Sequence, residues 1–362
     1  MLFLTNEHVQ AVLDMPACLQ ALEDAYAELA EAHAAYRPRM DMYVPQEPHY
    51  YRWGTMEGVS RKQGIFAIRM KSDMLVWSGG TEEKYCLEPG TFCGLIFLVS
   101  VRNAEPLAIM NDGYVQHMRV GAAAGLGVKY LARQNSRVLA MIGSGGMART
   151  YAEAICAVRP IERIRVYSPT RANREAFAVE MQARLNVPVE AMESAEQAVR
   201  GADVVALTTD SLGPVIKPEW LEPGMHVTNV RSNEAGPDVF ARADVVFRLG
   251  FATFMFDPPP PGTVCGSDGI FGYLAGTPEE AKRIPAAPPG RKIDSAKTPT
   301  LPDLIAGKCV GRTEDRQITF LNNQGTQGLQ FAAVAGKAYE LAKAKGLGHS
   351  LPLEWFVQKI RD

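Results

Sequence analysis

Several features that define other protein classes are missing from this sequence of 362 residues. Its six cysteines are scattered, without a CxxC pair or a histidine at ligand spacing, so we expect reduced thiols and neither a disulfide framework nor a metal site. No apolar run approaches the roughly 18 residues of a membrane-spanning helix. The first residues lack the charged segment of a secretion signal. A formal charge of −2, without a basic block, argues against nucleic acid or an anionic membrane as a partner. We therefore expect a soluble, cytoplasmic protein.

What is present is a hydrophobic fraction of 47%, which allows sizeable cores and favours two domains over one. The clearest motif runs from Arg137 to Ala148 and predicts a strand, a tight turn and a helix. Its apolar run Val138–Ile142 is too short for a helix and is typical of a buried parallel strand. The next six residues, Gly-Ser-Gly-Gly-Met-Ala, fit the pattern Gly-x-Gly-x-x-Ala of dinucleotide-binding turns.

Each position of that pattern has a physical reason. Gly143 lets the chain turn sharply, Gly145 removes a side chain where the backbone approaches a pyrophosphate, and Ala148 lets the helix lie close to the sheet. The N-terminus of the helix offers unpaired N–H groups to the phosphates. A tight turn without a ligand is the alternative. Further apolar strands at 164–167 and 203–207, however, follow at the spacing of βαβ units and favour a nucleotide site.

We therefore expect an α/β fold with a Rossmann-type, doubly wound parallel sheet that binds a dinucleotide at the carboxyl ends of its strands. The residues expected to contact the cofactor lie in the turn and at the ends of neighbouring strands: Gly143, Ser144, Gly145, Gly146, Met147, Ala148, Ser168, Thr170, Arg171, Thr208, Thr209, Asp210, Val230 and Ser232.

The end of the second strand of this sheet bears on which dinucleotide is bound. An NAD site usually has Asp or Glu there, which binds the ribose hydroxyls and repels a 2′-phosphate. Here Tyr167 is followed by Ser-Pro-Thr-Arg without an acid, and Arg171 and Arg174 offer cations to a phosphate. Solvated arginines at a helix start are the alternative, but cations there oppose the helix dipole and favour an anionic partner. We predict NADP(H) rather than NAD(H).

The first third of the chain has a different pattern. Residues 7–34 have helical spacing interrupted by Pro16, so we expect two consecutive helices. Strands are expected near 36–45 and at 65–73, 91–101 and 106–110, with a loop at 74–92, which together make an α+β unit. Period two places Arg69 and Lys71 on one face of their strand, where a cation is costly unless it meets a carboxylate. A helix at 113–133, with Arg119 near its start, leads into the glycine-rich strand.

Taken together, these motifs resemble the ornithine cyclodeaminase/mu-crystallin family. The resemblance covers nearly the whole chain and rests on segments in a fixed order: Arg37-Pro-Arg39, Arg69-Met-Lys-Ser72, Asn111-Asp112 to Met118-Arg119, Ala122-Ala-Ala124, Lys129-Tyr-Leu-Ala132, the glycine-rich turn, Pro223-Gly-Met-His226 and Gly311-Arg-Thr313. It implies a substrate-binding α+β domain at 1–120 and 313–362 that forms a homodimer. It also implies a nicotinamide-binding Rossmann domain at 121–312. A Pro- and Gly-rich insert at about 252–300 is expected as surface packing, with a lid as the alternative.

By position, the resemblance assigns Arg39, Lys71 and Arg119 to the carboxylate of the substrate, and Lys71 also to proton donation or hydrogen bonding at the reacting group. The family's catalytic aspartate corresponds to Asn233 here, with Glu234 adjacent. An amide cannot take up a proton as a carboxylate can, so specific cyclisation of ornithine is disfavoured. The candidate catalytic residues are Lys71, Asn233 and Glu234.

The chemistry implied by this resemblance is hydride transfer between nicotinamide and a carbon that bears an amine or imine. We therefore expect an NAD(P)-dependent oxidoreductase acting on a small α-amino or α-imino acid, either an amino-acid dehydrogenase or an imine reductase. Two alternatives stay open: an ornithine cyclodeaminase-type ammonia-lyase, in which the hydride is taken and returned, and a cofactor-binding protein without catalysis.

Overall fold

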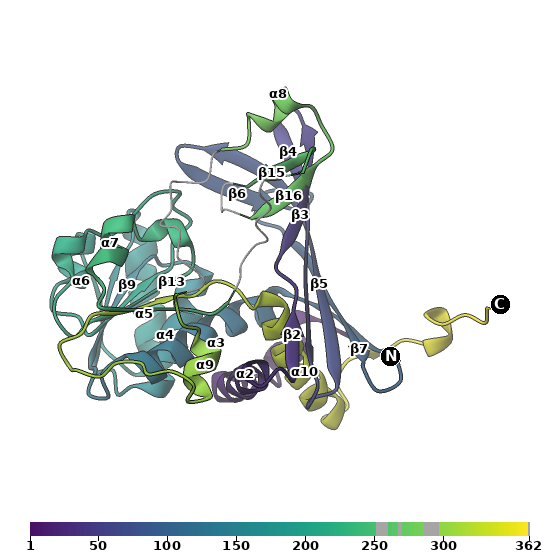
Figure 1. The fold of residues 1–362 in the computed structure, drawn as a ribbon, viewed down its shortest axis with the longest axis horizontal. Coiled ribbons are helices and arrows are strands. Elements are labelled where there is room, and N and C mark those ends of the chain that lie inside the picture. The colour runs from purple at the N-terminus through teal and green to yellow at the C-terminus, as the bar shows by residue number, and fades with distance from the viewer. Residues whose placement is uncertain (251–259, 267–269, 286–296, 361–362) are drawn as a thin grey trace.

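The computed structural model describes residues 1–250, 260–266, 270–285 and 297–360. These residues form two β-sheets, one mostly antiparallel and one parallel, with helices packed against both (Figure 1). A long helix, α3 (Gly113–Leu131), connects the last strand of the first part of the chain to the first strand of the parallel sheet. None of the helices formed by the described residues is long and apolar enough to span a bilayer.

The first sheet contains eleven of the described strands, in the order β15-β16-β3-β4-β5-β7-β8-β1-β18, with β2 beside β4 and β6 beside β5. Its two longest strands are β4 (His49–Ser60) and β5 (Ile65–Ser78), which pair antiparallel. The others are β1 (Leu2–Leu4), β2 (Ala34–Tyr36), β3 (Met40–Gln46), β6 (Thr81–Tyr85), β7 (Cys93–Ser100), β8 (Pro106–Asn111), β15 (Thr263–Cys265), β16 (Phe271–Leu274) and β18 (His349–Ser350).

Alternation of side chains gives this sheet two different faces. Helices α2 (Met15–Ala30) and α10 (Gln327–Ala344) pack on one face, where Ala67 and Leu98 are fully buried (Figure 1). A Cβ on Gly58 would lie 2.3 Å from the backbone of Gly328, so glycine lets α10 contact the sheet directly. On the opposite face the described residues place no α-helix, and the alternate side chains, such as Ile68 and Phe97, are partly exposed.

The second sheet has seven parallel strands among the described residues, in the order β11-β10-β9-β12-β13-β17-β14. Helices cover both of its faces, because alternate residues of β9 enter two different apolar cores: Leu139 and Met141 one, Ala140 and Ile142 the other. This is the Rossmann-type, doubly wound architecture that the sequence predicts. Its elements are β9 (Val138–Ile142), α4 (Gly146–Val158), β10 (Arg163–Tyr167), α5 (Arg171–Leu185), β11 (Val189–Ala191), α6 (Ala195–Val199), β12 (Val204–Leu207), β13 (His226–Asn229), α7 (Pro237–Arg242), β14 (Val245–Arg248) and β17 (Thr319–Asn322).

Several predicted elements are confirmed at nearly the expected bounds. The strand Val138–Ile142 and the helix that begins at Gly113 are present as predicted. Residues 7–34 form α1 (Asn6–Gln10) and α2, and Pro16 lies in the first turn of α2 after the N-cap Asp14, where its missing N–H costs nothing. The boundary between the two helices therefore follows from proline and capping chemistry.

Three predictions are wrong. The expected loop at 74–92 is largely a hairpin of β5 and β6 around Gly79 and Gly80, whose φ angles of +55° and +78° suit a two-residue turn. The domain boundary at 312/313 misplaces β17, which pairs with β13 and β14 in the parallel sheet. From the insert expected in the Rossmann domain, β15 and β16 join the first sheet beside β3. Much of the rest of that insert lies outside the described residues.

Candidate active site

The glycine-rich turn has the geometry of an anion site. Gly143 adopts a φ of +112°, and a Cβ there would lie 2.4 Å from the carbonyl oxygen of Thr208. A Cβ on Gly145 would instead meet open space, and α4 begins at the next residue without a side-chain cap. The first N–H groups of α4 are therefore available to an anion, and the small residues leave room for it. These features fit the pyrophosphate of a dinucleotide.

Most of the predicted cofactor residues lie around this turn, where the parallel strands end. Ser144 and Ser168 approach each other through their hydroxyl oxygens at 2.9 Å, which joins the ends of β9 and β10. Thr208 is buried and its hydroxyl donates to the carbonyl of Ile142 at 3.1 Å. Ala148 is fully buried, as close packing of α4 on the sheet requires, and Met147 is partly buried beside it.

The two arginines after β10 differ in their environments. The side chain of Arg171 is 74% exposed and pairs with Glu175, one helical turn further on, at 2.7 Å. Arg174 is buried, pairs with Glu193 at 2.7 Å and donates to the carbonyl of Ser168. Arg174 therefore holds the loop after β10 in place, and only Arg171 is available to a ligand phosphate. The expectation that both arginines meet the phosphate is wrong for Arg174.

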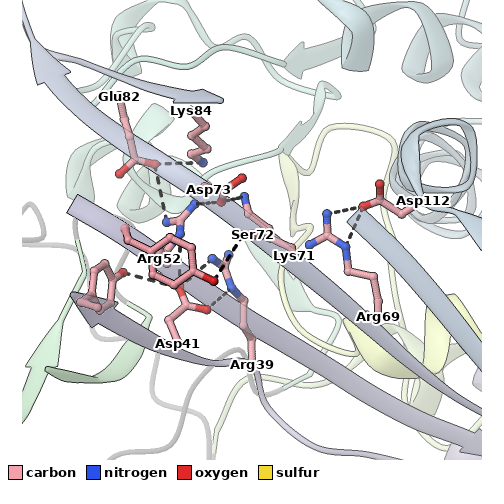
Figure 2. A network of polar contacts seen from close by, with 12 residues as sticks. Arg39, Asp41, Arg52, Arg69, Lys71, Ser72, Asp73, Glu82, Lys84 and Asp112 are labelled. Atoms are coloured by element: carbon pink, nitrogen blue, oxygen red, sulfur yellow. Dashed lines mark hydrogen bonds and ion pairs between the residues drawn. The ribbon is translucent and has the colours of Figure 1, made fainter. Parts of the chain in front are cut away.

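A network of charged side chains crosses the helix-covered face of the first sheet (Figure 2). Cross-strand pairing sets Asp41, Gly54, Lys71 and Gly94 in one row on this face. A Cβ on Gly54 would lie 2.4 Å from a carboxylate oxygen of Asp41, and one on Gly94 would lie within 2.3 Å of the Asp112 carboxyl group. The two glycines therefore make room for carboxylates on both sides of Lys71.

Arg52 lies at the centre of this network and is completely buried. It donates to Asp73 at 2.9 Å and lies 3.8 Å from carboxylate oxygens of both Asp41 and Glu82. Arg39 binds Asp41 with two hydrogen bonds of 2.8 and 2.7 Å. Buried charges of this kind persist only when they are paired. The carboxylates of this network thus hold its cations at fixed positions on the sheet.

Lys71 contacts Asp73, the same carboxylate that Arg52 uses. Burial first, and then the charges of Arg52 and Lys84, hold the pKa of Lys71 well below its usual range, while Asp73 acts in the opposite direction. Although burial alone raises the pKa of Asp73, Lys71 and Arg52 lower it to about 2. Lys71 is therefore a lysine whose proton is unusually easy to remove, beside a carboxylate that stays ionised.

Arg119 lies in a second group on the same face. Its guanidinium lies 4.8 Å from the centroid of the Phe331 ring, and Arg69, paired with Asp112, lies 5.5 Å from the same ring. Arg119 donates to the amide oxygens of Gln330 and Gln116 and forms no ion pair with any described carboxylate. Burial, and then the charge of Arg69, lower the pKa of Arg119 to about 9. It is a buried cation without a counter-charge in the described part of the chain, and an anionic ligand supplies one.

Glu234, one of the candidate catalytic residues, lies in an environment that is typical of a structural residue. This carboxylate is fully buried and accepts hydrogen bonds from the backbone N–H groups of Val230 and Arg231 and from the Thr209 hydroxyl, at 2.7 to 2.8 Å. It joins the ends of β12 and β13, and burial raises its pKa. Asn233 donates its amide N–H to the carbonyl of Ser211 at 2.7 Å, which leaves the amide oxygen as its acceptor.

Four predicted cofactor residues lie in the same loops. Thr209 and Val230 bind Glu234, whereas Asp210 is exposed and its carbonyl accepts from Arg231 at 3.3 Å. Ser232 begins the 3-10 turn Ser232–Glu234.

The tip of the β5–β6 hairpin connects the two sheets at this site. Thr81 forms a β-bridge with Ser211, and the N–H of Leu212 donates to the carbonyl of Gly80 at 3.3 Å. Arg231, which follows β13, lies 3.8 Å from Glu82 of β6. The charged network of the first sheet therefore lies next to the carboxyl ends of the parallel strands.

Of the predicted substrate residues, the structure brings Arg39 and Lys71 into one network and places Arg119 in the neighbouring group with Arg69. Sequence reasoning missed the carboxylates Asp41, Asp73, Glu82 and Asp112 and the central Arg52. The local signals for these partners are the spacings of Asp41 two residues after Arg39 and of Asp73 two residues after Lys71. No cluster of three or more metal-binding side chains occurs among the residues that the structure describes.

Comparison with known proteins agrees with this geometry. Residues 1–346 match the model of the ornithine cyclodeaminase/mu-crystallin family. A Delta(1)-pyrroline-2-carboxylate reductase of Bacillus cereus is 31% identical over 266 residues, 72% of this chain and 74% of the relative. An archaeal alanine dehydrogenase dimer with bound NAD superposes with a TM-score of 0.73 and 26% identity, covering 97% of this chain and 99% of that one. The Thermococcus litoralis Delta(1)-pyrroline-2-carboxylate reductase, in complex with NADH and L-proline, superposes with a TM-score of 0.74 and 24% identity, covering 97% of this chain and 100% of that one. The chain therefore belongs to the ornithine cyclodeaminase/mu-crystallin family.

Proposed function

We propose that the protein is an NAD(P)-dependent imine reductase or amino-acid dehydrogenase acting on a small α-imino or α-amino acid. The observation that carries this proposal is a dinucleotide turn combined with two cations on the same face of the first sheet, Lys71 of β5 and Arg119 of α3. Hydride exchange with the substrate carbon is the chemistry that a bound nicotinamide supplies. The 31% identical Bacillus cereus relative is a Delta(1)-pyrroline-2-carboxylate reductase, which supports the same class of substrate.

The substrate carboxylate is assigned to Arg119 and Lys71, with Arg39 beside them. Arg119 has the strongest need for an anion, because no described carboxylate pairs with it and it is buried. A guanidinium binds a carboxylate with two parallel hydrogen bonds, which also orients the substrate. Arg39 is already bound by Asp41 through two hydrogen bonds, so its contribution is smaller and partly structural.

Proton transfer at the reacting nitrogen is assigned to Lys71. Reduction of an imine requires a proton on nitrogen, and oxidation of an amine requires a proton acceptor. Lys71 is suited to both because its pKa lies well below the usual range of lysine, whereas the amide of Asn233 forms hydrogen bonds but does not take up or release a proton. Asp73 fixes the position of the Lys71 ammonium.

An ornithine cyclodeaminase is the second candidate, and the amide at position 233 disfavours it. In that reaction a carboxylate that handles the amine is expected at this position, and the adjacent Glu234 is occupied by backbone N–H groups. A cofactor-binding protein without catalysis is the third candidate. The buried Arg119 disfavours it, because this guanidinium has no described carboxylate partner and lies on the sheet face next to the dinucleotide turn, where a substrate anion would pair with it.

Of the two nicotinamide dinucleotides, we propose that the protein prefers NADP(H) to NAD(H). No carboxylate side chain occurs at residues 168–171, immediately after β10, and Arg171 extends into solvent next to the N-cap Thr170, whose side chain makes no capping hydrogen bond. Arg171 is then the residue that pairs with a 2′-phosphate. Two solved relatives contain NADH and NAD, so the proposed preference differs from the cofactors in those structures.

A homodimer is proposed as the assembly. The face of the first sheet opposite α2 and α10 has partly exposed apolar side chains, including Ile68 and Phe97, which are direct cross-strand neighbours. An apolar sheet face that no helix of the same chain covers is a typical interface between subunits. The archaeal alanine dehydrogenase that shares this fold is a dimer.

The decisive experiment is an assay of substrates followed by nicotinamide absorbance. Purified protein is mixed with NADPH or NADH and either cyclic α-imino acids or α-keto acids with ammonia or amines. Oxidation of the cofactor by an imino acid supports the proposal. Release of ammonia from a diamino acid without net change in absorbance identifies a cyclodeaminase instead, and binding of cofactor without turnover of any substrate favours the third candidate.

A further inference from the structure

Helices α3 and α4 cross along a seam in which small residues bring the two backbones together. A Cβ on Gly121 of α3 would lie 2.5 Å from the carbonyl oxygen of Thr150 on α4. One turn further along, a Cβ on Gly125 would lie 2.9 Å from the Cβ of Ala154. Residues four apart lie on the same face of a helix, so both contacts belong to one line of packing.

The next contact along this line joins His117 to Gly146. His117 precedes Gly121 by four residues, and Gly146 precedes Thr150 by four. A Cβ on Gly146 would lie 2.9 Å from Cε1 and 3.1 Å from Nε2 of the His117 ring. Any side chain larger than hydrogen at residue 146 displaces the imidazole. The two glycines of the Gly145-Gly146 pair therefore have different roles. Gly145 leaves open space at the turn, whereas Gly146 makes room for a histidine.

The His117 ring has no hydrogen-bond partner within the described residues. It is partly buried and lies beside the first residue of α4, where uncapped backbone N–H groups face the predicted pyrophosphate. The charged groups around it are Asp112 and Arg119 on its own helix and Arg149 on α4. Burial first, and then Arg119 and Arg149, lower the pKa of His117, against Asp112. A partner-less imidazole in this position gains from an anion at the turn.

We propose that His117 is a cofactor-binding residue whose ring N–H donates a hydrogen bond to the pyrophosphate of the dinucleotide at the α4 N-terminus. This inference rests on the proposed function, because it assumes that a nicotinamide dinucleotide binds at this turn. It adds a residue from outside the glycine-rich motif to the phosphate site. It also makes cofactor affinity depend on pH through a group of this chain.

The sign of that dependence follows from linkage. A bound phosphate anion favours the protonated ring, so the pKa of His117 is higher in the complex than in the free protein. A complex that holds more protons than its free components binds more tightly as pH falls. Affinity for the cofactor therefore increases on acidification between the two pKa values and levels off below the lower one.

The test uses two substitutions that separate volume, hydrogen bonding and charge. His117→Phe keeps a ring of similar size but removes the N–H, and His117→Gln keeps a donor but cannot become charged. Binding of NAD⁺ and NADP⁺ is measured by isothermal titration calorimetry from about pH 6 to about pH 8.5, where histidine changes its charge. NAD⁺ is the primary probe, because the 2′-phosphate of NADP⁺ itself titrates near about pH 6. His33→Phe, at an exposed histidine, is the matched control.

The expected result is a loss of binding without a loss of stability. His117→Phe should bind NAD⁺ about 5- to 30-fold more weakly than wild type at about pH 6, with a flat pH profile. His117→Gln should keep part of the affinity but lose the increase on acidification. The melting temperature of His117→Phe without cofactor should equal or exceed that of wild type, because a partly buried polar ring without a protein partner is replaced by an apolar one. A purely structural role predicts the reverse: a lower melting temperature and unchanged affinity at the same degree of folding.

A double-mutant cycle gives a second measurement. Gly146→Ala places a methyl group against the His117 ring, so it should weaken NAD⁺ binding in the wild-type background more than in His117→Ala. Equal NAD⁺ affinity and pH dependence in wild type and His117→Phe overturn the assignment of His117 while leaving the proposed function intact. Absence of any NAD⁺ or NADP⁺ binding by the wild-type protein overturns both.

Discussion

Lys71 and Asp73 lie two residues apart on one face of β5, and the ammonium of the lysine contacts the carboxylate of the aspartate. Arg52 binds the same carboxylate at 2.9 Å, so one anion is shared by two buried cations. Burial is the main reason that the pKa of Lys71 stays low although an aspartate touches it, and the nearby charge of Arg52 lowers this pKa further. This arrangement gives the first prediction.

Removing the charge of Asp73 should shift the pH dependence of imine reduction to lower pH. Because Asp73 opposes the lowering of the Lys71 pKa, Asp73→Asn lets that pKa fall further. A lysine with a lower pKa loses its proton at lower pH, so kcat/KM in the reductive direction should begin to decline earlier. The measurement is kcat/KM against pH for wild type and variant.

Lys71→Arg and Lys71→Ala are the companion variants. Arginine keeps the charge but does not lose its proton in this range, so Lys71→Arg should bind substrate with little change in KM and lose kcat. Lys71→Ala should lose about 2 to 4 kcal/mol of transition-state stabilisation. An unchanged pH profile in Asp73→Asn, together with wild-type turnover in Lys71→Arg, contradicts the role of Lys71 in proton transfer.

Substitution of Arg119 and of Arg39 should affect the kinetics to different degrees, because the two arginines have different partners. Arg119→Ala should raise KM for the acid substrate strongly, because no described carboxylate competes for this guanidinium. The loss in kcat/KM should correspond to about 2 to 4 kcal/mol. Arg39→Ala should have a smaller effect, because Asp41 already holds Arg39. Arg37→Ala is the control: Arg37 is half-exposed and pairs with Glu57, so its kinetics should match wild type. Wild-type KM in Arg119→Ala excludes this arginine from the carboxylate site.

Cofactor preference should depend on Arg171. Arg171→Ala should weaken NADP(H) binding by about 1 to 2 kcal/mol and leave NAD(H) binding unchanged, because only the 2′-phosphate meets this residue. The effect should shrink at high salt, since Arg171 is largely exposed. Arg200→Ala is a matched control, because Arg200 forms an equivalent exposed pair with Glu196 one helical turn away. Tighter binding of NAD(H) than NADP(H) by wild type would falsify this preference.

Glu234 should prove structural. Glu234→Gln replaces an acceptor of several N–H and O–H groups by an amide whose NH₂ end faces other donors, so the free energy of unfolding should fall by about 2 to 4 kcal/mol. The enzyme that remains folded should keep the wild-type dependence of kcat/KM on pH. Chemical denaturation and pH–rate profiles of the two proteins check this. A changed acidic limb in the pH profile at normal stability would restore Glu234 as a catalytic group.

The Rossmann part of the fold was predictable because its signals are local. Val138–Ile142 and Gly143 lie within a few residues of each other, and apolar period, glycine positions and helix start all agree. Strand β4 was not assigned, because Arg52 and two glycines interrupt its apolar alternation. Arg52 is buried because Asp41, Asp73 and Glu82 reach it from three other strands of the sheet, and that arrangement is set by long-range register.

The same distinction applies within the candidate site. Lys71 and Arg119 could be proposed from the sequence, because charges within otherwise apolar elements indicate a ligand or a partner. The structural role of Glu234 could not, because it depends on Thr209 at the end of another strand. The contact of His117 with Gly146 was equally hidden, since it arises from the crossing of two helices that are joined through an intervening strand.

The uncovered face of the first sheet should be a dimer interface. Ile68 and Phe97 are cross-strand neighbours there and are partly exposed, whereas Ala67 and Leu98 on the other face are fully buried under α10. Phe97→Asp places a charge at the centre of this apolar face and should convert a dimer into monomers, because a charge without a partner is costly to bury. Val179→Asp is the control, since Val179 is 74% exposed on α5, in the other part of the molecule. Light scattering at micromolar concentration should give the mass of two chains for wild type and Val179→Asp and of one chain for Phe97→Asp, and a monomeric wild type would rule out this interface.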